Sequence, residues 1–155
     1  MKMKIKLLKL VVTLLAMASL TSCLNPKIVP VTPVTQVVNT ENSQENLHQM
    51  LVLVAKYKKY EILSDNGTTK MRIKYSLLAR KGTDISSITY DVVNNKNSYT
   101  MSHVDSKNFN HKDGKISGSY AWYIDHFNDV LEKMYDNPEY LARVKVIVAN
   151  PNVHH

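Results

Sequence analysis

The spacing of apolar residues changes along the chain and predicts the elements of one small domain. From residue 43 to about residue 59, apolar side chains recur three and four positions apart, the period of an amphipathic helix. These side chains are Leu47, Met50, Leu51 and Val54. Asn42 followed by Glu45 three residues later resembles a capping box at the helix start. The pattern therefore predicts a first helix over this segment.

After this helix the period changes to two, which predicts half-buried strands. Three alternating segments lie within residues 70–80, 88–92 and 99–103. Turn residues separate them at Lys81–Asp84 and Asn94–Asn97, where asparagine tolerates positive φ. We expect an antiparallel meander whose inward side chains are Met71, Ile73, Tyr75, Ile88, Tyr90 and Met101.

A long helical stripe follows a polar segment, residues 105–115, that predicts a loop. The stripe consists of Tyr120, Tyr123, Ile124, Phe127, Leu131 and Met134. Ser117 or Ser119 could cap its start, and Pro138 suits the first position of a further short helix. Residues 143–148 fit either the end of that helix or a last strand. The order of these elements predicts a two-layer α+β sandwich over residues 43–150. It would consist of an N-terminal helix, a three-stranded antiparallel meander and a C-terminal helix. Residues 151–155 would form a tail that ends in His154 and His155.

The first 22 residues carry a different pattern. Basic residues precede an apolar run over about residues 10–20, and the run ends in Leu20-Thr21-Ser22-Cys23. The basic residues are Lys2, Lys4, Lys6 and Lys9. A transmembrane helix needs about 20 apolar residues, and this run is shorter and interrupted by Thr13 and Ser19. The segment instead has the architecture of a secretory signal.

Cys23 is the only cysteine and stands where signal cleavage is expected. The segment resembles the export signal of bacterial lipoproteins, and this resemblance implies that Cys23 becomes the acylated N-terminus and anchors the protein in a membrane of the cell envelope. Leu24 follows it rather than the Asp that retains such proteins in the inner membrane, so we expect the outer membrane. Acylation leaves no thiol for a disulfide, a redox pair or a cysteine zinc site.

Removing this segment changes the charge. The whole chain has a net charge of +7, but four of its 20 basic residues lie in the signal, which contains no acidic residue. The remainder has 16 basic and 13 acidic residues, a net charge of +3. Such a charge is ordinary for solubility. Together with export, it argues against nucleic acid as a partner.

Residues 23–42 contain Pro26, Pro30 and Pro33 among valines and threonines, without a helical period. This composition predicts an extended tether of about 60 Å at full stretch, at about 3 Å per residue. The alternative is that residues 34–38 pair as an edge strand of the sheet.

Two motifs resemble a family of small bacterial lipoproteins of uncharacterised function over about residues 47–134. In that family a loop Asp-Ser-x-Asn-Leu precedes a helix opening Ile-His-x-x-Tyr-Asn-x-Trp-Val. Here the loop reads Asp105-Ser106-Lys107-Asn108-Phe109, and the helix opening spans residues 116–124. The chain departs from the family at His103 (Tyr in the family), Ser117 (His), Ala121 (Asn) and Tyr123 (Trp). The resemblance implies the fold and no reaction.

Residues 103–113 are the strongest candidate for chemistry. His103, Asp105 and Ser106 are the residue types of a nucleophilic triad. His103 and His111, together with a carboxylate such as Asp113, could instead hold a metal. No Gly-x-Ser-x-Gly elbow or tight His-x-x-x-His spacing accompanies them. The simpler interpretation is that Asp105, Ser106 and Asn108 bond to loop backbone, while His103 points into the core.

Surface side chains suggest where a partner would bind. Lys70, Arg72 and Lys74 form a basic row on one strand that could face an anionic glycan, although such charges also keep a sheet soluble. Trp122 lies beside the apolar stripe and could contact a protein. We therefore expect a non-enzymatic envelope lipoprotein, without cofactor, metal or catalytic residues, whose domain binds or supports another envelope component. The alternative is a small hydrolase or metal-dependent enzyme that uses residues 103–113.

Overall fold

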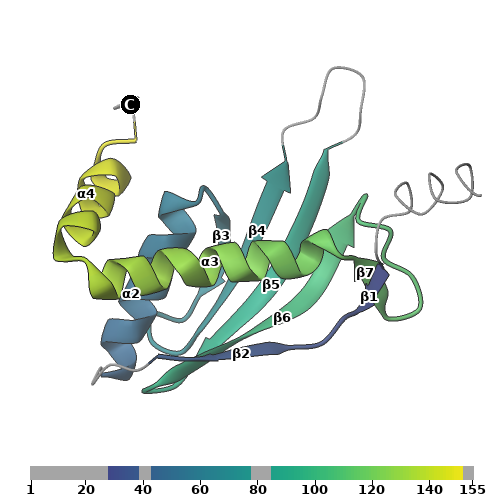
Figure 1. The fold of residues 1–155 in the computed structure, drawn as a ribbon, viewed down its shortest axis with the longest axis horizontal. Coiled ribbons are helices and arrows are strands. Elements are labelled where there is room, and N and C mark those ends of the chain that lie inside the picture. Colours follow the sequence, from purple (N-terminus) through teal and green to yellow (C-terminus); the bar gives the residue numbers. More distant parts are fainter. Residues whose placement is uncertain (1–27, 39–42, 78–84, 152–155) are drawn as a thin grey trace, which may run out of the picture.

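The computed structural model describes residues 28–38, 43–77 and 85–151 (Figure 1). Its elements are β1 (Ile28–Pro30), β2 (Val34–Val37), α2 (Gln44–Tyr57), β3 (Glu61–Asp65), β4 (Lys70–Leu77), β5 (Ser86–Asn94), β6 (Ser98–Lys107), β7 (Lys115–Ser117), α3 (Ser119–Asp136) and α4 (Pro138–Ala149). The described residues form an α+β fold with three helices, a five-stranded antiparallel sheet and a two-stranded sheet. None of these helices is long and apolar enough to cross a membrane. Cys23 and the signal segment lie outside the described residues, as do Asn42 and the turn Lys81–Asp84.

The large sheet has the strand order β2-β6-β5-β4-β3, so the predicted meander β4-β5-β6 forms its centre. The expectation of three strands is wrong, because a further strand flanks the meander on each side. Strand β3 was not predicted, because its register with β4 shifts between Ile62 and Ser64 and this shift breaks the alternation of apolar and polar side chains. Strand β2 is the edge strand that the sequence left as an alternative.

The segment predicted to be a free tether is therefore partly folded. Val34–Val37 pairs with β6, and Ile28–Pro30 pairs with β7, placing Ile28 opposite Ser117. Valines and threonines suit a pleated edge. Pro30 is the last residue of β1 and Pro33 directly precedes β2, so neither occupies the interior of a strand, where a backbone donor would be needed. The 60 Å extension expected for this segment is wrong for these residues.

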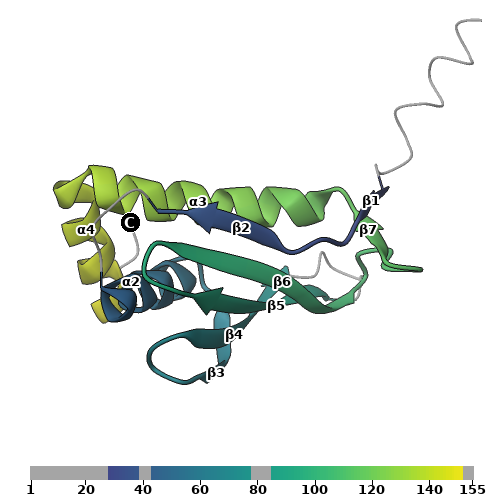
Figure 2. The same ribbon diagram turned by 90° about the horizontal axis from the view of Figure 1, so that it is seen from below.

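Helix α3 lies across one face of the large sheet (Figures 1 and 2). Its predicted stripe is buried, as are the predicted inward positions of the sheet except Tyr75, which is partly buried. The expected packing of this helix on the meander is confirmed. Helices α2 and α4 gather at the end of the molecule where α3 ends, far from β1 and β7 (Figures 1 and 2).

The helix boundaries differ from the predictions by a residue or two. Ser43 caps α2, its side chain accepting a hydrogen bond from the backbone N–H of Asn46 at 3.1 Å. Gly118 precedes α3 without a side-chain cap, so neither predicted serine serves that role. Asn137 ends α3 and caps α4, with Pro138 at its first position as predicted. Residues 143–148, left open by the sequence, are helical.

The turn between β5 and β6 forms where predicted, but by another mechanism. The side-chain oxygen of Asn95 accepts hydrogen bonds from the backbone N–H groups of Asn97 and Ser98 at 3.0 and 2.9 Å. Neither Asn95 nor Asn97 has positive φ. The turn is thus stabilised by asparagine as an acceptor.

Candidate functional site

The loop predicted over residues 105–115 begins later than expected, because β6 continues to Lys107 and only residues 108–114 connect it to β7. A bulge between β5 and β6 pairs Tyr90 with His103 and Thr89 with Asp105. The extra residue, Val104, reverses the alternation. His103 therefore faces inward with Tyr90, whereas Asp105 is exposed on the outer face.

This bulge separates the members of the conceivable triad. Ser106 pairs with Ile88 on the inner face, opposite to Asp105. Within the described part of the chain, the buried Nε2 atom of His103 and Oγ atom of Ser106 have no hydrogen-bond partner, so they are not bonded to each other. A triad needs the serine on the histidine and the histidine on the acid. The arrangement for nucleophilic catalysis is absent from these residues.

His103 and His111 are nevertheless brought together, with ring centroids 4.7 Å apart. The ring of Tyr120 lies 6.0 Å from His103. Burial and the neighbouring His111 lower the pKa of His103, although Asp105 opposes this. Across residues 28–38, 43–77 and 85–151, no group of three or more histidine, cysteine or acidic side chains could hold a metal.

The loop prediction is wrong for Asp105 and Ser106 but correct for Asn108. The side chain of Asn108 donates a hydrogen bond to the carbonyl of Ile85 at 3.3 Å, and its φ of 60° is the left-handed conformation that asparagine tolerates. Asp113 also has positive φ, in the tight turn Lys112–Lys115, whose end residues exchange two backbone hydrogen bonds. Asp113 thus has a structural place in this turn, at a position with left-handed backbone conformation.

The predicted basic row lies on the outer face of the sheet and is partly neutralised. Arg72 donates two hydrogen bonds to Asp91, at 2.6 and 2.9 Å, and Lys70 lies 3.5 Å from the same carboxylate. The hydrogen bonds from Arg72 are the main cause that holds the pKa of Asp91 below its usual range. Lys74, opposite Glu61 on β3, completes the row. The basic row therefore presents less unpaired positive charge than the sequence suggested, because Lys70 and Arg72 share the carboxylate of Asp91.

Trp122 is 55% exposed, as expected for a residue beside the stripe. It stacks on His126 with an interplanar angle of 18° and ring centroids 5.0 Å apart. The Nζ atom of Lys58 is hydrogen-bonded to His126. Burial, followed by Lys58, lowers the pKa of His126. Trp122 is therefore an exposed aromatic ring held in a fixed position.

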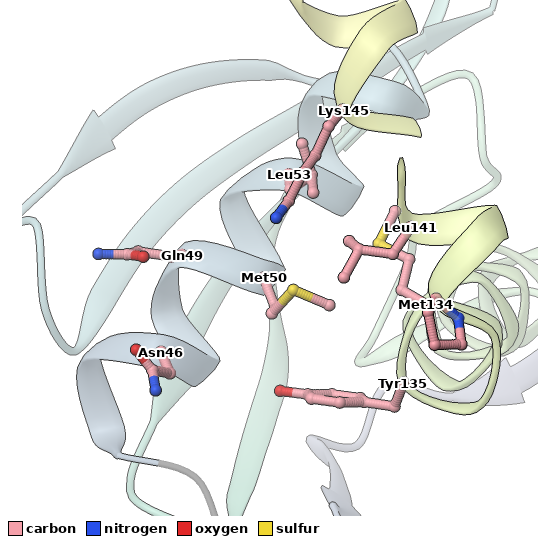
Figure 3. Close-up of a pocket in the computed structure, with 9 residues that line it drawn as sticks. Asn46, Gln49, Met50, Leu53, Met134, Tyr135, Leu141 and Lys145 are labelled. Carbon is pink, nitrogen blue, oxygen red and sulfur yellow. The ribbon is translucent and has the colours of Figure 1, made fainter. Parts of the chain in front are cut away.

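A feature that the sequence did not reveal is a hollow of about 440 Å³ between α2, the end of α3 and α4 (Figure 3). Met50 of α2 and Leu141 of α4 point toward one another across it, and Tyr135 of α3 lies beside them (Figure 3). The remaining lining residues are Asn46, Gln49, Leu53, Met134, Pro138 and Lys145. Its volume falls in the range of about 300–1,000 Å³ that is typical of small-ligand sites.

A second feature missed by the sequence analysis is a buried polar network around His48. Its Nδ1 atom lies 2.9 Å from Oδ1 of Asn94, and its Nε2 atom lies 2.7 Å from Oδ1 of Asp65. Asn94 in turn donates to the carbonyls of Gln44 and Thr68. One signal was present in the sequence: His48 lies among the apolar positions of the first helix, where a polar side chain needs partners.

Comparison with known proteins adds no assignment. No protein-family model matches the chain, and no curated protein matches it significantly in sequence.

Proposed function

We propose that the protein is a bacterial envelope lipoprotein, anchored through an acylated Cys23, whose small domain binds another envelope component without catalysing a reaction. The single observation that carries this proposal is that the two ends of the domain differ. Strand β1 lies at one end of the molecule, and the hollow between α2, the end of α3 and α4 lies at the opposite end (Figures 1 and 2). One end would meet the membrane while the other is presented away from it.

The connection between anchor and fold is short. Only four residues separate Cys23 from Ile28, the first residue of β1. At about 3.6 Å per residue the chain from Cys23 to Ile28 spans at most about 18 Å. The end of the domain formed by β1 and β7 would therefore rest close to the bilayer.

The same end carries suitable charge. Lys112 and Lys115 form the base of an exposed turn, and the backbone N–H of Val31, next to β1, donates to the carbonyl of Gly114 in that turn at 2.9 Å. Lysines near an anionic membrane surface contribute about 1 kcal/mol each. In the proposed orientation this turn faces lipid headgroups. The residue after Cys23 is Leu24, which favours the outer membrane.

Of the partner contacts expected from the sequence, Trp122 is more accessible to a partner than Lys70 and Arg72 are. Trp122 is exposed, and in this proposal its ring contacts an envelope protein. Lys70 and Arg72 are tied to Asp91, so an anionic glycan would have to displace internal ion pairs. The hydrolase alternative is not carried forward, because the bulge at Val104 turns Asp105 away from His103 and Ser106. The metal-dependent alternative is not carried forward either, because among the described residues no third histidine, cysteine or acidic side chain joins His103 and His111 in a group that could hold a metal.

Substitution of Cys23 tests the anchor. Cys23→Ser should abolish labelling by a radioactive fatty acid and leave the protein unprocessed or released from membranes. A Cys23→Ser protein that still fractionates with membranes at its mature size would refute the proposal.

The orientation has its own test. If the native cysteine is acylated, a cysteine introduced at Lys112 or at Glu139 is the only free thiol and can carry a fluorophore. Energy transfer to an acceptor on lipid headgroups should be stronger from position 112 than from position 139. Equal transfer from both positions would contradict the orientation.

A further inference from the structure

Helix α4 is attached to the domain by unusually little buried surface. Among its 12 residues only Val144 is fully buried, whereas α2 buries five side chains and α3 buries seven. Other apolar residues of α4, including Leu141 and Val148, remain partly exposed. A helix that leaves apolar surface uncovered creates space for another apolar group.

This space forms two hollows along the seam between α2 and α4. The first, of about 440 Å³, is lined by residues 46–53 of α2, including Met50 and Leu53, and by the end of α3 and the facing side of α4. The second, of about 290 Å³, is lined by the end of α2 and by Ile147, Val148 and Pro151. We call the two hollows together the α2–α4 seam.

The charges on the α2–α4 seam have one sign. The charged residues that line it in the described part of the chain are Lys145 in the first hollow and Lys56 and Lys59 in the second. Among the residues that the structure describes, no carboxylate lines either hollow. A bound molecule with an anionic group would therefore find a partner, whereas a cationic one would not.

The apolar part of the first hollow suits a flexible chain better than a rigid ring. Two of its lining residues, Met50 and Met134, have unbranched side chains that adapt to irregular shapes. Lys145 of α4 and Leu53 of α2 also line this hollow (Figure 3). This arrangement is an apolar hollow with one cation at its margin.

We propose that the α2–α4 seam binds an anionic single-chain amphiphile of the fatty-acid class, with the chain between Met50 and Leu141 and the carboxylate near Lys145. The proposal rests on the binding role proposed above, but not on acylation of Cys23. It names the chemical class of the component that the domain would bind.

The test uses a long-chain fatty acid with a diazirine in its chain and, as a matched probe, the corresponding alcohol. The full-length protein is reconstituted in phosphatidylcholine vesicles, irradiated with each probe and digested, and the labelled residues are mapped by mass spectrometry. Labelling should concentrate on residues 50–53 and 134–141. Labelling spread over the surface, or absent from these segments, would overturn the proposal.

Two variants separate the roles of charge and space. Lys145→Gln should reduce labelling by the acid about twofold to fivefold, as expected for one exposed ion pair, without changing labelling by the alcohol. Lys133→Gln, on α3 and outside the lining, should change neither. Leu141→Trp should block both probes by filling the hollow. Acid labelling that is unchanged in Lys145→Gln, or reduced equally in Lys133→Gln, would overturn the assignment of the carboxylate.

This experiment can fail separately from the anchor test. Labelling of the seam does not require an acylated Cys23, so an unlabelled seam would leave the anchor standing. A failed anchor test would equally leave seam binding intact.

Discussion

His48 and Asp65 are joined by a hydrogen bond of 2.7 Å between Nε2 and Oδ1, although they belong to different elements, α2 and β3. His48 is only 2% exposed. Asn94 uses its amide group to donate to two carbonyls, which leaves its Oδ1 atom to accept from Nδ1 of His48. The imidazole therefore links the helix to the turns at one end of the sheet.

Removal of this imidazole should destabilise the domain. His48→Leu leaves the Asn94 oxygen without a donor in a buried position, and each unsatisfied group costs about 1–3 kcal/mol. Thermal unfolding of the domain without residues 1–23 measures the loss. The control is Gln49→Ala, an exposed neighbour on the same helix that should change stability by less than about 0.5 kcal/mol. Equal melting temperatures for the two variants would contradict this role of His48.

Acid should weaken the same link. Burial of Asp65 opposes its ionisation, but hydrogen bonds from the Gly67 N–H and from His48 lower its pKa below the usual range. A carboxyl whose pKa is lower in the folded state contributes stability above its unfolded pKa of about 3.9, and this contribution is lost as the pH falls through the folded pKa.

Urea unfolding at pH 6 and pH 3 can isolate this contribution. Asp65→Asn keeps an acceptor oxygen but cannot titrate, so the stability difference between wild type and variant should shrink toward pH 3. Asp91, whose pKa is also lowered, remains in both proteins and contributes the same pH dependence to each. A difference that is constant between the two pH values would exclude Asp65 as a source of the acid sensitivity.

Strict periodicity explains why some elements could be predicted and others could not. Strands β4 to β6 and helices α2 and α3 each repeat an apolar period over several residues, and all five form. Strands β1 and β7 have three residues each and exist because they pair with one another across a long sequence separation. No local pattern could reveal such pairing.

The arrangement of residues 103–106 also depends on a feature that the local sequence pattern does not show. A single inserted residue, Val104, decides that Asp105 faces away from His103, and alternation alone cannot show a bulge. The α2–α4 seam depends on how incompletely α4 packs, which is a tertiary property. The sequence did predict correctly that Trp122 is exposed and that His103 faces inward.

The bulge also reverses an expectation for Asp105. Because its side chain is exposed on the outer face, Asp105→Ala should change stability by less than about 0.5 kcal/mol. Asn108→Ala should cost about 1–2 kcal/mol, since alanine is strained in the left-handed conformation at φ 60°. Asn108→Gly should recover most of that loss. A larger effect at Asp105 than at Asn108 in thermal unfolding would contradict the exposed position that the bulge gives to Asp105.

The packing of α3 on the sheet should dominate the stability of the domain. Phe127 is 1% exposed, and its ring lies 5.7 Å from Tyr60 in an edge-to-face contact and 6.3 Å from Tyr99. Truncation of a buried phenylalanine costs about 3–5 kcal/mol, a large share of the roughly 5–15 kcal/mol that stabilises most domains. Phe127→Ala should therefore lower the melting temperature severely. Asp129→Ala, two residues further along the same helix and exposed, should stay within about 0.5 kcal/mol of wild type. Comparable losses in the two variants would refute the packing of this helix face on the sheet.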